Sequence, residues 1–171
     1  TEHVLASQIG ATVLAQGGNA VEAAVAANAA MGVLAPMMCG IGGDLFAFVY
    51  EAKSGKLHGL NASGWSPSNL TPEWLKNKGL TNMPQGGIDS VTVPGAVHGW
   101  QRLLDRFGRM KFSKVIGPAV RYAEEGFPVS ELVSAYWSSS EALLRKDTNA
   151  AKTFLPNGKS PRVGEIFRNP D

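Results

Sequence analysis

The sequence predicts an α+β fold in which a series of helices is interrupted by one β-hairpin. Residues 20–34 are almost all small and apolar, which is typical of a helix buried on nearly every side. Residues 45–50 are rich in β-formers, and residues 56–60 can return as the partner strand after a turn. Apolar residues recur at helical spacing in three later segments, 96–107, 112–125 and 129–145.

Two helices are expected before the hairpin. Residues 5–14 have the apolar spacing of a helix, and the pair Gly17-Gly18 is suited to the left-handed conformation that ends one. Asn19 is a good N-cap for the helix 20–34, and Glu22 lies three residues later. That spacing is typical of a capping box, in which each residue bonds the other's backbone.

The segments around the hairpin carry further expectations. We expect the first strand to be buried, because residues 45–50 are nearly all apolar. Thr71-Pro72 is expected to begin a short helix, with Thr as N-cap and Pro at the first helical position. Residues 91–93 are expected to form a short strand that leads into a turn, and no pattern is found from Lys146 onward.

The composition is that of an ordinary globular protein, with 44% hydrophobic and 18% charged residues among 171. The net charge of +2 and the scattered basic residues argue against a nucleic-acid partner. The chain starts without Met and shows no signal peptide, although a removed one stays possible. Both ends look cut, so residues 1–171 are expected to be a single partial domain of a longer protein. Cysteine scarcity slightly favours the cytoplasm.

The glycine-rich corner at residues 40–44 does not fit a phosphate site. A dinucleotide-binding motif needs a strand before the glycines and a helix after them, and here the order is reversed. A P-loop needs a Gly-Lys-Ser/Thr triplet, and none occurs in the sequence. His3, His58 and His98 share no metal-ligand spacing, and Cys39 is expected to be an inert thiol. No metal and no cofactor are therefore predicted. Asp44 is expected to cap the glycine turn, and a carboxylate aimed into a cavity is the alternative.

Several motifs occur in the order of a known family. These are Ala6-Ser7 and residues 16–26, 40–44, 93–99 and 117–127. Together they resemble the first part of the large subunit of the γ-glutamyltranspeptidase family, and the likeness covers nearly the whole chain.

The resemblance implies an N-terminal-nucleophile hydrolase fold, an αββα sandwich of which this chain covers only part. Such enzymes are made as a precursor (a zymogen) that cuts itself autocatalytically. The new N-terminal threonine of the small subunit is then the nucleophile, with its own α-amine as the base. It would lie outside this chain, so no catalytic residue is predicted here, and Thr1 is not that residue. The implied partners are the small subunit and a small amide substrate, with no nucleic acid and no membrane.

One departure from the family bears on specificity. In true transpeptidases an arginine after the second strand grips the glutamyl α-carboxylate, and that position falls on Ser63 here. We expect Ser63, Asn61 and Trp65 to form a substrate-facing wall; the alternative is that this peptide is only a packed connection. The peptide resembles the divergent branch of oxamate amidohydrolase-like and acylase-like members. Two other functions stay open, a true γ-glutamyl hydrolase or transferase and a non-catalytic scaffold.

Overall fold

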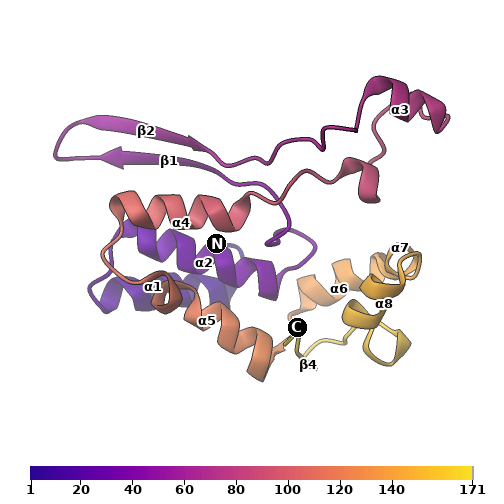
Figure 1. The fold of residues 1–171 in the computed structure, drawn as a ribbon. Coiled ribbons are helices and arrows are strands. Elements are labelled where there is room, and N and C mark those ends of the chain that lie inside the picture. The colour runs from indigo at the N-terminus through magenta and orange to yellow at the C-terminus, as the bar shows by residue number, and fades with distance from the viewer. Residues whose placement is uncertain (171) are drawn as a thin grey trace. The chain divides into compact units, whose positions relative to one another are not determined.

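A computed structural model describes residues 1–170 of the chain (Figure 1). These residues form two compact units. One unit contains residues 1–40 and the chain from Gly108 onward, and the other contains residues 41–107. The expectation of a single partial domain stays a prediction.

The first unit is built around α2 (Ala20–Leu34), which packs against α1 (Val4–Ala15) and α5 (Phe112–Glu125). The capping box is confirmed: the Asn19 side chain accepts from the backbone of Val21 and Glu22, and the Glu22 carboxylate accepts from the Asn19 N–H at 2.7 Å. Most of α2 is buried, as its small apolar residues predict.

Glu22 also binds a second, distant segment of the same unit. Its side chain is fully buried, and its other oxygen accepts hydrogen bonds from the backbone N–H groups of Arg109 and Met110. Burial by itself raises the pKa of Glu22, but the backbone donors of Asn19, Arg109 and Met110 outweigh it and leave the pKa below its ordinary value. The buried charge is therefore satisfied by three N–H groups.

The expected single helix over residues 129–145 is wrong. The structure has α6 (Glu131–Ser139) and α7 (Glu141–Leu144), separated at Ser140. The hydroxyls of Ser139 and Ser140 both donate to the carbonyl of Tyr136, at 2.8 and 2.9 Å. Serine side chains that accept or donate hydrogen bonds to nearby backbone groups in this way compete with the hydrogen bonds of the helix, and the helix is interrupted here.

A further helix, α8 (Thr148–Phe154), follows where the sequence showed no pattern. Asp147 caps it by accepting from the N–H of Ala150 at 2.8 Å. The strands β3 (Phe127–Pro128) and β4 (Ile166–Phe167) then pair antiparallel. An aromatic cluster joins these elements, with Trp137 and Phe167 edge to face at 4.7 Å between ring centroids.

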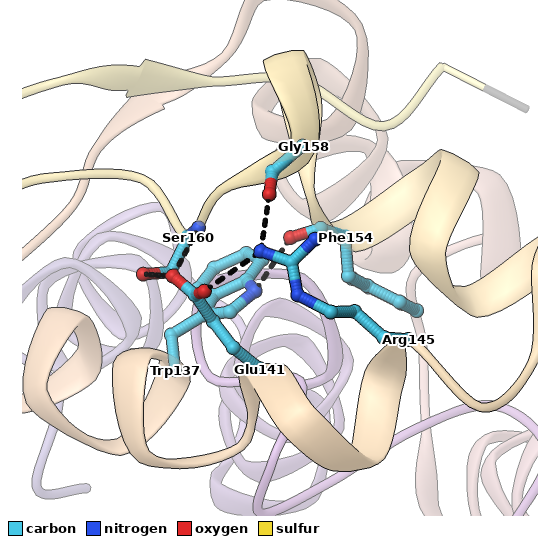
Figure 2. A network of polar contacts seen from close by, with 6 residues as sticks. All are labelled: Trp137, Glu141, Arg145, Phe154, Gly158 and Ser160. Carbon is cyan, nitrogen blue, oxygen red and sulfur yellow. Dashed lines mark hydrogen bonds and ion pairs between the residues drawn. The ribbon is translucent and has the colours of Figure 1, made fainter.

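Figure 2 shows the polar network that holds this C-terminal part together. Glu141 accepts from the N–H and the hydroxyl of Ser160, at 2.9 and 2.7 Å. Arg145 donates to Glu141 at 3.0 Å and also to the carbonyl of Gly158. These bonds lower the pKa of Glu141 to about 2, the Ser160 hydroxyl being the largest cause. The network connects α7 to the loop after α8.

The second unit contains the hairpin, made of β1 (Phe46–Glu51) and β2 (Lys56–Asn61) (Figure 1). The strands are antiparallel, with Phe46 opposite Asn61. The expected helices are present as α3 (Pro72–Asn77), capped by Thr71, and α4 (Ala96–Phe107); a 3₁₀ turn, η1, covers Ile88–Ser90.

The first strand is not buried as expected. Phe46, Phe48 and Tyr50 are 65%, 81% and 66% exposed, whereas Ala47 and Val49 between them are half-buried. Successive side chains of a strand point to opposite faces. Only one face is covered within this unit, where His58 of β2 lies against Phe107 of α4 with ring centroids 5.3 Å apart. The other face carries the exposed aromatic side chains.

The expected strand at residues 91–93 is also wrong, because the structure forms no ladder there. The N–H of Val93 donates to the carbonyl of Trp65 at 2.9 Å, and Pro94 follows. Proline has no N–H to continue a ladder, so the pairing is limited to this one contact.

Candidate functional site

The peptide from Asn61 to Trp65 begins where the hairpin ends. Leu45 and Ala62 exchange two backbone hydrogen bonds, at 2.8 and 3.4 Å, immediately after the Phe46–Asn61 pair. The Asn61 side chain then accepts from the N–H of Ser63 at 2.8 Å. Asparagine commonly bonds the backbone two residues on in this way, and the bond turns the chain away from the sheet. Two of the predicted wall residues are thus brought together.

Asp44 holds the next residue of the peptide. Its Oδ1 accepts from the Gly64 N–H and from the Thr92 hydroxyl, both at 3.1 Å. The Gly64 bond is the largest cause of a lowered pKa at Asp44, followed by Thr92, with a smaller part from the Ser63 hydroxyl. The carboxylate is therefore ionised at neutral pH, and it connects its own segment to those of Gly64 and Thr92.

The expectation that Asp44 caps its own glycine turn is wrong. Its donors lie 20 and 48 residues further along the chain, so they could not be seen in the local pattern. The glycine corner is used differently: the carbonyl of Gly43 accepts from the N–H groups of Gly95 and Ala96, at 3.1 and 3.0 Å. These are orphan donors at the start of α4, and Gly43 satisfies them.

The segments at this place approach so closely that two positions require glycine. A Cβ on Gly64 would lie 1.4 Å from the carbonyl oxygen of Val93, and one on Gly95 would lie 2.0 Å from that of Ala62. No side chain can occupy either position without moving the backbone. The peptide 61–65 and the segment 92–95 are therefore packed backbone to backbone.

Of the predicted wall residues, Ser63 is half-buried, and Asn61 and Trp65 are exposed. The Trp65 side chain is 87% exposed, although its carbonyl is bound by Val93. Sequence reasoning did not find Thr92 or the role of Asp44, because no local motif links residues so far apart. The contribution of Asn61, Ser63 and Trp65 to substrate binding stays a prediction.

No group of three His, Cys, Asp or Glu side chains within residues 1–170 could hold a metal ion. Cys39 is a free, half-buried thiol, and its pKa is raised by burial first and by the charge of Glu2 second. A raised pKa reduces the thiolate fraction, which fits the expected inert thiol.

No helix in the described part of the chain combines the length and hydrophobicity needed to span a membrane.

The family model described as gamma-glutamyltranspeptidase matches residues 6–171. The chain belongs to the gamma-glutamyltranspeptidase family. This confirms the resemblance drawn from the ordered motifs, which fall within the matched residues.

Individual family members support the same conclusion. The glutathione hydrolase-like YwrD proenzyme of Bacillus subtilis (strain 168) is 40% identical over 96% of this chain and 31% of its own length. The oxamate amidohydrolase proenzyme of Klebsiella pneumoniae is 36% identical over 98% of this chain and 32% of its own. The crystal structure of a cephalosporin acylase from Bacillus halodurans superimposes with a TM-score of 0.90 at 42% identity, over 97% of this chain and 32% of that one.

These matches confirm the fold class. The chain is part of the N-terminal-nucleophile hydrolase fold of the gamma-glutamyltranspeptidase family. It spans about a third of the length of these relatives.

Proposed function

We propose that this chain is the N-terminal part of the large subunit of an amide-bond hydrolase of the gamma-glutamyltranspeptidase family. The observation that carries the proposal is the family match over residues 6–171, with relatives named as hydrolases, an amidohydrolase and an acylase. A cytoplasmic location is part of the proposal, on the basis of the single cysteine.

The nucleophile is proposed to be an N-terminal threonine that lies outside these residues and is freed when the precursor cuts itself. Its α-amine, with an ordinary pKa of about 7.7 to 8.0, takes the hydroxyl proton at neutral pH. The hydroxyl oxygen attacks the amide carbon, the C–N bond breaks, and the amine leaves with a proton. Water then cleaves the acyl ester to release the acid and the threonine. The small subunit from the same precursor is the proposed partner.

This chain is proposed to supply the wall against which the acyl group lies, formed by Asn61, Ser63 and Trp65. Asn61 and Ser63 are held in one turn, and Asp44 fixes the following residue. No arginine occurs between Gly40 and Arg102, so this stretch has no guanidinium to grip an α-carboxylate. Hydrolysis of amides without that carboxylate is therefore favoured over γ-glutamyl transfer.

Mass spectrometry of the full-length product tests the proposal first. We expect two fragments, the second beginning with threonine, and no cleavage when that threonine is replaced by alanine. The cleaved enzyme should hydrolyse a simple acyl anilide. An uncleaved product without turnover of any anilide would contradict the proposal and favour a non-catalytic scaffold.

A second candidate is a γ-glutamyl hydrolase or transferase, which the relative named glutathione hydrolase-like favours. It predicts that a γ-glutamyl anilide is hydrolysed much faster than a simple acyl anilide. Comparable rates on both would count against this candidate.

A further inference from the structure

We propose that Asp44 makes the Ser63 wall select against a carboxylate on the acyl group, so that the enzyme takes acyl groups that are neutral or cationic at that point. This inference rests on the proposed function and names the class of its substrate. It follows from the hydrogen bonds of the peptide 61–65 and from the charge beside it.

Two backbone donors of the peptide, those of Ser63 and Gly64, are already in use. The Ser63 N–H is bound by the Asn61 side chain at 2.8 Å, and the Gly64 N–H is bound by Asp44 at 3.1 Å. A substrate carboxylate is normally held by N–H groups or by cationic side chains. These two N–H groups cannot serve a substrate without giving up the bonds that shape the peptide.

The Ser63 hydroxyl lies beside the same carboxylate, because it contributes to the lowered pKa of Asp44 after Gly64 and Thr92. A substrate group at this turn therefore meets the negative charge of Asp44 beside it. An ammonium group fits this place, and a carboxylate does not.

The charge of Asp44 is not cancelled nearby. Among the described residues, no Lys or Arg forms an ion pair with it, and Lys78 is paired with Asp89 at 3.1 Å instead. The Asp44 side chain is exposed, and its bonds to Gly64 and Thr92 are to neutral donors. A substrate carboxylate next to Ser63 would meet this negative charge, and like charges at short range repel.

A matched series of p-nitroanilides tests the inference on the processed full-length enzyme. The acyl groups are butyryl, 4-aminobutyryl and glutaryl, which carry a hydrogen, an ammonium group or a carboxylate on the same carbon, C4, counted from the scissile carbonyl. We expect kcat/KM for the glutaryl anilide to be at least tenfold below that for the butyryl anilide. The 4-aminobutyryl anilide should equal or exceed the butyryl anilide.

Asp44→Asn is the decisive variant, because it keeps the acceptor oxygen for Gly64 and Thr92 and removes the charge. We expect it to raise the glutaryl-to-butyryl ratio of kcat/KM about tenfold. Glu73→Gln removes one exposed carboxylate from α3 of the same unit and should leave the ratio unchanged.

Different outcomes contradict the proposed function and the inference about Asp44. If the wild type hydrolyses none of the anilides, the proposed function fails and the inference fails with it. If it hydrolyses the glutaryl and butyryl anilides equally well, or if Asp44→Asn leaves their ratio unchanged, the inference fails and the proposed function stands. Should Asp44→Asn not be processed, the wild-type series alone decides.

Discussion

The carboxylate of Asp44 accepts a hydrogen bond from the backbone of Gly64, 20 residues later, at 3.1 Å. Asp44 immediately precedes the hairpin and Gly64 follows it, so this bond extends the pairing beyond the last backbone bonds between Leu45 and Ala62. The open end of the hairpin is thus fixed by a side chain. Thr92 binds the same oxygen and adds a third segment.

Replacing Gly64 by alanine should disrupt this arrangement. The added Cβ would lie 1.4 Å from the Val93 carbonyl oxygen, so the backbone must separate. We expect a loss of roughly 3 kcal/mol in the free energy of unfolding, and loss of anilide turnover in the full-length enzyme. Gly42→Ala is the matched control, since nothing lies within 4 Å of its Cβ. Equal stabilities of the two variants in urea unfolding would contradict the predicted overlap.

Glu22→Ala should destabilise the first unit strongly. It leaves the backbone N–H groups of Asn19, Arg109 and Met110 without their acceptor in a buried place, at a cost of about 3 kcal/mol or more. Glu22→Gln keeps one acceptor oxygen and should lose less. Glu124→Ala, on the exposed side of α5, should change the unfolding free energy by less than about 0.5 kcal/mol. Denaturant unfolding of the three variants checks this order, and a Glu22→Ala protein as stable as Glu124→Ala would refute it.

Protonation of the buried His3 should lower the stability of the folded state on mild acidification. It is 8% exposed, and neither ring nitrogen has a hydrogen-bond partner among the described residues. Burial lowers its pKa below the ordinary value of 6.5, and the Glu2 charge opposes this only in part. The unfolded chain then binds the proton more readily, so stability is full above pH 6.5 and declines as pH falls from there toward the folded pKa.

Thermal unfolding at pH 7.5 and 5.5 tests the His3 prediction. His3→Gln should show a smaller drop in Tm between the two pH values than the wild type. The exposed His98 provides the control, and His98→Gln should behave as the wild type. An unchanged pH dependence in His3→Gln would show that the buried imidazole does not titrate in this range.

Protonation of Glu141 should cause a second loss of folding stability, at a lower pH than the loss caused by His3. Its pKa is lowered from 4.5 to about 2, first by the Ser160 hydroxyl. A carboxylate with a lowered pKa stabilises the folded state above its unfolded value, so this contribution is present above pH 4.5 and is lost as pH falls toward 2. Glu141→Gln should flatten the loss of stability in that window, whereas Glu131→Gln, an exposed carboxylate of α6, should not. Circular dichroism during acid titration measures both.

The 171-residue chain by itself should associate. The exposed face of the hairpin carries Phe46, Phe48 and Tyr50, together with Leu57 at 66% exposure. Such a continuous apolar face on a two-stranded hairpin promotes association in water. Sedimentation should show oligomers that diminish in a Phe48→Ser variant. A monomeric wild-type chain with a cooperative unfolding transition would contradict this.

Local patterns predicted the helices that have strong apolar periodicity or a capping box. The capping box at Asn19 and Glu22 and the limits of α2, α4 and α5 follow from residues within a few positions of one another. The helix at residues 129–145 was predicted too long, because apolar spacing does not show that Ser139 and Ser140 bond the Tyr136 carbonyl. The sequence does not predict α8, since this helix has no buried residues and hence no apolar periodicity, although Asp147 caps it.

The family, the helices with strong periodicity, the hairpin and the neutral residue at position 63 can all be inferred from the residues alone. The roles of Glu22 and Asp44 depend on how the chain packs. The partners of Glu22 lie 87 and 88 residues away and those of Asp44 lie 20 and 48 residues away. No periodicity records such bonds, because every residue except proline carries the same backbone N–H, and the Thr92 hydroxyl lies 48 residues from Asp44. Their position is fixed only when the packed elements bring the donors to a carboxylate.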